Sequence, residues 1–317
     1  MMIGTPWLAD VGFHAGELAV QRRAGVTQDA ARLSGMLGPV ALTAGMAGFL
    51  RDRTFLVISG RDPSGRLWTS PLVGRPGFLE VLSDTSVAVH AALPAGDPLR
   101  GLKASQKIGM VTVEFATRRR VRINGILTVS DGDLLVVEVE QAYGNCPQYI
   151  QPRVLVPREI DGAGGDYVRQ GSTLSTDDRE LIRAADTFFL GTANPERGSD
   201  ASHRGGPSGF VRIDERGLWW PDFTGNNLFN SFGNIAVNPE ASLLFIEFAT
   251  GRSLQLSGTV QIEWGEPGRP GDDGRTGRIA HFALQRLVAG RILPAREITH
   301  TPSPRNPALT DRQGRFR

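Results

Sequence analysis

Four arginines stand within five consecutive positions of a stretch whose alternating pattern predicts a β-strand. They are Arg118, Arg119, Arg120 and Arg122 in "TRRRVRINGIL". Strand side chains alternate between two faces, so Arg118, Arg120 and Arg122 are expected on one face and Arg119 on the other. Guanidinium groups bind phosphates and carboxylates through paired hydrogen bonds, so the stretch is a candidate anion site. The alternative is a solvated strand face whose charges prevent sheets from aggregating.

A second group of candidate binding residues lies in the C-terminal half of the chain. "SHRGGPSGFVRI" (202–213) contains His203, Arg204 and Arg212, and "TGNN" (224–227) contains Asn226 and Asn227. These side chains offer further hydrogen-bond donors to an anion. A surface histidine and an ordinary polar turn are the alternatives for His203 and for "TGNN".

Several catalytic classes have no support in the sequence. It contains no phosphate-binding Gly-x-x-x-x-Gly-Lys-Ser/Thr loop, no Gly-x-Gly-x-x-Gly opening a helix after a strand, no Gly-x-Ser-x-Gly elbow and no His-Glu-x-x-His. The 5 histidines are scattered and Cys146 is the single cysteine, so neither a metal site nor an internal disulfide is expected. No catalytic residue can be named from these patterns.

Composition indicates a turn-rich protein that stays in the cytoplasm. The 317 residues include 39 glycines and 20 prolines, which favours short strands over long helices. The basic side chains that give the net charge of +2 are locally clustered, which does not favour a nucleic-acid partner. No long apolar run and no signal-peptide pattern are present, so neither membrane attachment nor secretion is expected.

The arginine stretch belongs to a sequence that occurs twice. "VEFATRRRVRINGIL" (113–127) returns as "IEFATGRSLQLSGTV" (246–260), and "TFLVIS" (54–59) returns as "TFFLGT" (187–192). "SPLVGRPGFLEV" (70–81) matches "SHRGGPSGFVRI" (202–213), and the three pairs keep their order at offsets of 132 or 133 residues. Such regularity indicates a tandem duplication. The copies are unequal, because the four arginines are matched by Gly251, Arg252, Ser253 and Gln255, whereas His203, Arg204 and Arg212 are matched by Pro71, Leu72 and Glu80.

Each copy reads as about six short antiparallel strands, which suits a small barrel. The predicted fold is therefore mainly β (α+β), with two tandem barrels and a few peripheral helices. We expect a helical segment at 1–44, a first barrel at 45–160 and a second barrel at 177–265, opened by a helix at 177–186. Residues 266–317 are expected to hold a flexible Gly/Pro linker, one last element and a disordered tail at 301–317. The last element, 278–290, fits either a strand or a short helix.

The stretch from Ser202 to Phe248 resembles the pyridoxamine 5'-phosphate oxidase-like family of FMN-binding split barrels. The resemblance rests on a strand ending in a basic residue, a hairpin, a polar turn and then "NP" before an aliphatic strand. "RRRVRINGIL" is similar to another strand of that family. The family's barrels pair and bind FMN in the groove between them. A tandem repeat would then be an intrachain pseudo-dimer, with two fused split β-barrels.

The resemblance implies a single complete flavin site, built from the arginine strand of the first half and the hairpin and turn of the second. Arg212 corresponds to the family's phosphate-binding lysine, and Arg120 to a glutamine that reaches in from the partner subunit. The turn departs from the family pattern, which usually has Ser/Thr with Arg/Lys, because it contains Asp222, Asn226 and Asn227. The carboxylate of Asp222 would repel a phosphate. The predicted cofactor-binding residues are Arg118, Arg119, Arg120, Arg122, His203, Arg204, Arg212, Asn226 and Asn227.

The implied activity is oxidoreduction by hydride or electron transfer at a bound FMN. FAD, the deazaflavin F420 and haem are alternative cofactors, and a binding protein without turnover is the alternative function. The small-molecule substrate, the electron donor or acceptor, and a further pairing of two chains stay open. The segment "AYGNCPQYIQPR" (142–153) either forms a tight turn with Cys146 as a buried apolar residue, or folds over the crevice and lines the pocket.

Overall fold

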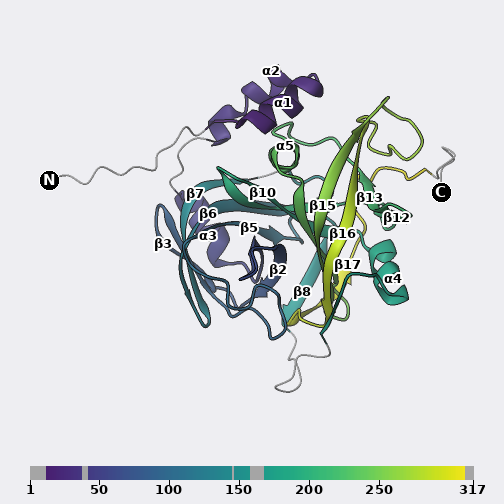
Figure 1. Ribbon diagram of the computed structural model, residues 1–317. Coiled ribbons are helices and arrows are strands. Elements are labelled where there is room, and N and C mark those ends of the chain that lie inside the picture. The colour runs from purple at the N-terminus through teal and green to yellow at the C-terminus, as the bar shows by residue number, and fades with distance from the viewer. Residues whose placement is uncertain (1–11, 38–41, 145, 158–167, 311–317) are drawn as a thin grey trace.

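Two antiparallel sheets with one strand order dominate the computed structural model, which describes residues 12–37, 42–144, 146–157 and 168–310 (Figure 1). The first sheet runs β2-β1-β5-β6-β7-β4-β3, and the second runs β11-β10-β14-β15-β16-β13-β12. Counted from the first strand of each half, the two orders are identical. The prediction of a mainly β chain with two tandem split barrels is therefore confirmed.

All the strand pairings in the described residues are antiparallel, and the strands range from 3 residues in β9 and β12 to 13 in β6, β15 and β16. The first sheet contains β1 (Phe55–Arg61), β2 (Leu67–Val73), β3 (Leu79–Ser83), β4 (Ser86–His90), β5 (Gln106–Glu114), β6 (Arg119–Asp131) and β7 (Leu134–Gly144). The second contains β10 (Thr187–Asn194), β11 (Gly198–Gly205), β12 (Arg212–Asp214), β13 (Gly217–Pro221), β14 (Glu240–Glu247), β15 (Arg252–Trp264) and β16 (Arg278–Gly290), with β9 (Arg169–Gly171) added beside β16. A third, two-stranded sheet pairs β8 (Arg153–Pro157) with β17 (Ala295–His300).

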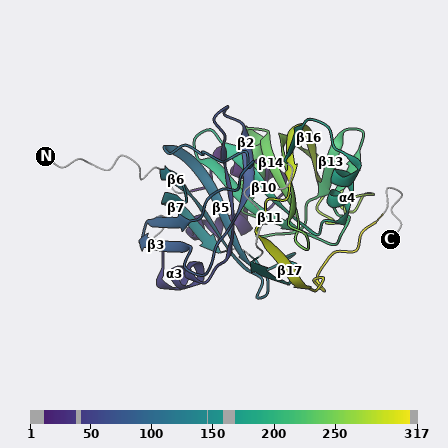
Figure 2. The ribbon, with the colours of Figure 1, turned by 90° about the horizontal axis from the view of Figure 1, so that it is seen from below.

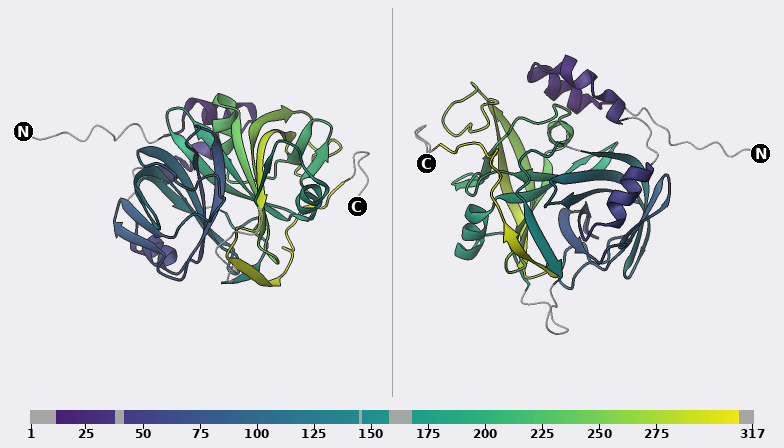
Figure 3. Two further views of the ribbon diagram at one scale, coloured as in Figure 1. Left: turned by 60° about the horizontal axis from the view of Figure 1, so that its bottom comes forward. Right: turned by 180° about the vertical axis from the view of Figure 1, so that it is seen from behind.

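The helices lie around the barrels (Figure 3). They are α1 (Ala15–Arg23), α2 (Thr27–Ala31), a 3-10 turn (Ser34–Leu37), α3 (Ala44–Arg51), α4 (Thr176–Ala184) and α5 (Asn230–Val237). The expected N-terminal helices and the helix that opens the second half are confirmed. Gly16 of α1 lies against the carbonyl of Gly233 in α5, so a side chain at either glycine would separate the two helices. None of the described helices is long and apolar enough to cross a membrane.

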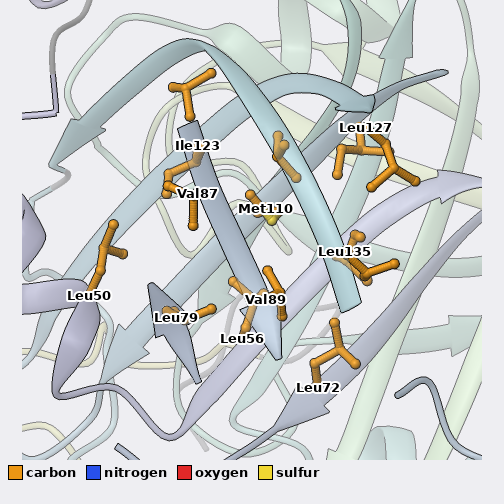
Figure 4. Close-up of a cluster of buried hydrophobic side chains, with 14 of the residues drawn as sticks. Leu50, Leu56, Leu72, Leu79, Val87, Val89, Met110, Ile123, Leu127 and Leu135 are labelled. Carbon is orange, nitrogen blue, oxygen red and sulfur yellow. The ribbon is translucent and has the colours of Figure 1, made fainter. Parts of the chain in front are cut away.

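Each barrel has its own hydrophobic core, as strand alternation requires. Leu56, Met110, Ile123 and Leu135 belong to the core of the first barrel (Figure 4). The second core includes Phe188, Phe245 and Phe282. Separate cores explain why each copy of the repeat kept its own pattern of apolar residues.

A third apolar cluster joins the two barrels. It contains Phe55 and Phe115 from the first half and Phe189 and Phe248 from the second. The ring centroids of Phe55 and Phe189 are 5.6 Å apart, and those of Phe115 and Phe248 are 5.5 Å apart. Here β5 packs beside β11, and β17 lies across the junction (Figure 2). The halves therefore form the intrachain pseudo-dimer that the duplication predicts.

The predicted end of the second barrel at residue 265 is wrong. β16 is a strand of the second sheet, with β15 on one side and β13 on the other. Residues 265–277 are not a flexible linker, because Asp273 accepts a hydrogen bond from Arg212 and Thr276 donates one to the carbonyl of Asp222. The tail was expected to be disordered, yet Thr301, Ser303 and Thr310 donate backbone hydrogen bonds to Pro152, Gln151 and Asp273. Residues 311–317 lie outside the described residues.

Gly109→Ala tests the contact between the halves. A Cβ at Gly109 would lie 2.4 Å from the Cα of Asp200, so β5 and β11 would have to move apart. We expect the free energy of unfolding in urea to fall by at least about 2 kcal/mol. In the control Gly48→Ala, on α3, the new Cβ meets no atom within 4 Å, and helix propensity predicts equal or higher stability. Unchanged stability of Gly109→Ala would contradict the close contact.

Candidate functional site

A cavity of about 120 Å³ lies in the crevice between the two halves. The first half contributes β6, Tyr143 of β7 and the segment that follows β7. The second half contributes the ends of β11 and β13, Phe210, the loop from Asp222 to Phe229, the first turn of α5, and Arg278 of β16. Six of the residues predicted from the sequence line this one cavity: Arg120, Arg122, His203, Arg204, Asn226 and Asn227.

The structure places the other three predicted residues elsewhere, which corrects the expectation that they share the site. Arg118 precedes β6 in a left-handed turn conformation (φ 55°), so it does not continue the strand alternation. Arg119 lies over the ring of Phe49, on the opposite side of β6. Arg212 donates to the carboxylate of Asp273 (2.7 Å) and has its guanidinium over Trp219.

Arg122 is neutralised by a buried carboxylate. Its Nη1 is 3.2 Å from Asp200, which also accepts hydrogen bonds from Asn124 and Ser231. Burial alone would lower the pKa of Arg122, but Asp200 and the Tyr143 hydroxyl beside it raise that pKa. Arg122 and Asp200 come from opposite halves, so this ion pair also ties the two barrels together.

Asp222 likewise has a cation of its own. Arg278 Nε donates to Asp222 Oδ2 at 2.8 Å, and Arg204 lies 3.8 Å from the other carboxylate oxygen. Burial raises the pKa of Asp222, and the two arginines oppose this shift. The predicted conflict between this carboxylate and a phosphate is therefore reduced. Sequence analysis missed Arg278, because the element that carries it could not be assigned to the barrel.

Arg120 and Arg204 keep positive charge that the protein does not fully neutralise. Arg120 Nη1 donates to His203 Nδ1 at 2.9 Å, and Arg204 shares Asp222 with Arg278. Burial, together with Arg122 and Arg204, lowers the pKa of Arg120 to about 9. The Nε atoms of Arg120 and Arg204 are buried and have no hydrogen-bond partner within the described parts of the chain. Buried cations of this kind favour a bound anion.

His203 serves as a neutral acceptor for Arg120. Burial, followed by the charges of Arg120, Arg153 and Arg204, holds the pKa of His203 well below its usual value. Because Nδ1 accepts a hydrogen bond from Arg120, the proton of the neutral ring is on Nε2. This Nε2 is buried and has no partner among the described residues.

Aromatic side chains form the rest of the cavity wall. The rings of Tyr149 and Phe223 lie 5.0 Å apart, and Trp220 and Phe229 also line the cavity. Tyr149, Asn227 and Phe229 all have the left-handed backbone conformation, with φ of 64°, 60° and 59°. Such conformations are costly for residues other than glycine and concentrate at functional sites. The wall is thus shaped by the backbone as well as by side chains.

The segment "AYGNCPQYIQPR" follows the second of its two alternatives. Cys146, Gln148 and Tyr149 line the cavity, and the Cys146 side chain is half-buried. The Tyr149 hydroxyl donates to the carbonyl of Thr224 (3.1 Å) and so connects this segment to the loop of the second half.

A second crevice, formed by the residues that the repeat makes equivalent to those of the cavity, is filled by hydrogen-bonded side chains. Gln255 occupies the repeat position of Arg122, and Asp97 that of Asn230. Gln255 Nε2 donates to Ser70 Oγ (2.8 Å) and Asp97 Oδ2 (3.1 Å), whereas in the cavity Arg122 donates to Asn230 (3.1 Å). Gln255 and Asp97 are buried, with 0% and 4% of their surface exposed. One crevice therefore lines a cavity, whereas its counterpart holds a closed polar core.

Asp97 should make stability depend on pH. Burial raises the pKa of Asp97 from 3.8 to about 6, against the hydrogen bonds from Ser70, Leu99 and Gln255. From pH 4 to pH 6 the unfolded chain loses this proton first, so the folded state loses about 2–3 kcal/mol of stability as pH rises. Asp97→Asn removes this dependence. In urea unfolding, the stability of the wild type minus that of the variant should fall by this amount across the interval; a constant difference would contradict the prediction.

Comparison with known proteins gives one family match. Residues 175–269 match the family model described as pyridoxamine 5'-phosphate oxidase, whereas no curated protein matches the sequence. Among solved structures, HupZ of Group A Streptococcus is 12% identical, with a TM-score of 0.32, over 38% of this chain and 98% of its own. HutZ, a haem storage protein from Vibrio cholerae, is 16% identical, with a TM-score of 0.29, over 36% of this chain and 94% of its own.

An FAD-binding protein from Mesorhizobium loti is 14% identical, with a TM-score of 0.29, over 40% of this chain and 99% of its own. The residues matched by the family model include α4 and strands β10 to β15. By this match, residues 175–269, which include His203 and Arg204, belong to the pyridoxamine 5'-phosphate oxidase-like family.

Proposed function

We propose that the chain binds one FMN in the cavity between its halves and acts as an oxidoreductase. The observation that carries the proposal is the pair Arg120 and Arg204, which come from opposite halves and are only partly neutralised. A phosphate monoester carries close to two negative charges at neutral pH and accepts several charge-assisted hydrogen bonds. It would supply the countercharge that this part of the crevice lacks.

The remaining walls fit the rest of an FMN molecule. Tyr149, Phe223 and Trp220 offer apolar faces to a planar ring system, and the amides of Asn227 and Gln148 offer donors and acceptors to its polar edge. The Nε atoms of Arg120 and Arg204 and the Nε2 of His203 are donors that none of the residues described in the structure uses. An apolar ligand would leave these donors unsatisfied.

The flavin would supply the hydride or electron transfer, and the chain's own residues would bind and shield it. Arg120 and Arg204 would hold the phosphate, and neutral His203 would keep Arg120 in position by accepting its hydrogen bond. The aromatic wall would exclude water from one side of the cavity, which strengthens the electrostatic contacts inside. FAD, F420 or haem would be held by the same cations through their own anionic groups.

Comparing the affinities for FMN and for riboflavin, which lacks the phosphate, tests whether the site recognises the phosphate or only the ring. We expect purified protein to carry FMN, recognised by its visible spectrum and by the mass of the group released on denaturation. The stripped protein should bind FMN about 100-fold more tightly than riboflavin, because charged hydrogen bonds are worth about 1.5–3 kcal/mol each. Bound FMN, once reduced, should be reoxidised by oxygen or an added acceptor faster than free FMN. Equal affinity for the two flavins would contradict a phosphate site, and slow reoxidation would indicate a binding protein.

Arg120→Ala tests the asymmetry of the two crevices. It removes a cation from the cavity wall, and we expect FMN affinity to fall by about 10-fold to 100-fold while riboflavin affinity changes little. The matched control is Arg252→Ala on β15, whose side chain is 38% exposed and 3.9 Å from Glu247. Isothermal titration of both variants would give the comparison. Equal losses would show that the cavity is not the cofactor site.

A further inference from the structure

A buried glutamine connects the cavity wall to the C-terminal tail. Gln151 follows Tyr149 by two positions and is 0% exposed. A glutamine amide without partners is costly in such a place, so the contacts that satisfy it are part of the fold. Those contacts come mainly from residues far along the chain.

Gln151 and Asn306 form a reciprocal amide pair. Gln151 Nε2 donates to Asn306 Oδ1 at 2.8 Å, and Asn306 Nδ2 donates to Gln151 Oε1 at 3.1 Å. The backbone N–H of Ser303 donates to the same Oε1 at 2.8 Å. Gln151 Nε2 also lies 3.1 Å from the carbonyl of Gly206, at the end of β11. The tail, the segment after β7 and β11 therefore meet at a single side chain.

Tyr149 is held in an unfavourable backbone conformation next to this junction. Its φ is 64°, and its carbonyl oxygen would lie 1.9 Å from any Cβ at Gly205. Its ring packs on Phe223 and covers one side of the cavity. A left-handed tyrosine persists only where its surroundings hold it. The hydroxyl of Tyr149 is held by the Thr224 carbonyl, and its backbone carbonyl accepts a hydrogen bond from Gln151 Nε2 at 3.3 Å.

The far end of the tail is fixed as well. Thr310 donates to Asp273 Oδ1 through its backbone N–H (2.8 Å) and its hydroxyl (2.7 Å). Arg212 donates to the carbonyl of Thr310 at 2.6 Å and to Asp273 Oδ2 at 2.7 Å. Arg212, which does not line the cavity, thus anchors the tail instead.

We propose that residues 303–310 form a latch that keeps the Tyr149 wall of the cavity closed. Asn306 and Ser303 hold Gln151, and Gln151 holds the segment 146–149 against β11. They act as positioning residues, since the ligand itself would meet Tyr149, Gln148 and Cys146. Release of the latch opens the wall and lets a ligand enter or leave. The inference concerns access to the cavity and holds for any ligand that binds there.

Asn306→Ala is the test, and Cys146 is its reporter. Cys146 is the single thiol of the chain, is half-buried and lines the cavity on the same segment as Tyr149. Loss of the amide pair should raise the rate of Cys146 alkylation by iodoacetamide about 10-fold, which corresponds to about 1.4 kcal/mol in the opening equilibrium. Hydrogen exchange of residues 146–152 should accelerate with it, while the melting temperature falls by only a few degrees, because Gln151 keeps its hydrogen bonds to Ser303 and Gly206.

Arg305→Ala is the control, because this neighbouring side chain is exposed. It should leave both rates at the wild-type value. Unchanged rates in Asn306→Ala, or an equal rise in the control, would overturn the latch.

The thiol and exchange rates are measured without FMN, so they separate the latch from the proposed function. If Asn306→Ala opens the wall and FMN never binds, the latch stands and the proposed function fails. If FMN binds and leaves the variant and the wild type at the same rate, with unchanged alkylation, the latch fails and the proposed function stands.

Discussion

Positive charge that the chain does not neutralise by itself governs the crevice between the barrels. Asp200 and Asp222 pair with Arg122 and Arg278, which leaves Arg120 and Arg204 close to each other and to those pairs. Repulsion among these buried cations would separate the two halves if the rest of the interface were not tightly packed. The cluster of phenylalanines from both halves and the close contact of Gly109 with β11 oppose that force. The apolar interface is therefore what allows a cavity lined by charged side chains to exist between two barrels.

Covalent fusion of the two copies allows a division of labour that a symmetric dimer cannot have. In a homodimer, every arginine of one crevice would recur in the other, and the repulsion would be doubled. Here Gln255 replaces the guanidinium of Arg122 and closes a hydrogen-bonded network with Asp97 and Ser70. The closed crevice holds the halves together through these hydrogen bonds and without a cluster of arginines. The open crevice keeps Arg120 and Arg204, the cations to which we assign the proposed ligand.

Local patterns were enough to predict the architecture and to name six of the residues that line the cavity. The repeat indicated that the two halves share a fold. The unequal distribution of arginines led to the prediction that one crevice combines the arginine strand of the first half with the hairpin and turn of the second. The hairpin alignment was less accurate. The turn between Arg61 and Leu67 is two residues longer than that between Asn194 and Gly198, so His203 corresponds in register to Leu72 and not to Pro71. A slip of one residue exchanges the faces of a strand, and only the observed pairing corrects it.

The residues that sequence analysis misplaced are those whose partners lie far away in the chain. Arg278 follows a Gly/Pro stretch that resembles a linker, yet β16 pairs along nearly its whole length with β15 and so brings Arg278 to Asp222. The family resemblance implied a phosphate-binding role for Arg212, but Arg212 does not line the cavity and instead donates to Asp273 and Thr310. An arginine can satisfy its charge at any carboxylate within reach, and the sequence does not show which one the fold brings close. The prediction for the tail was wrong for the same reason. Its polar composition suggested disorder, but the hydrogen bonds that order it come from Gln151 and Asp273, which are distant in the sequence.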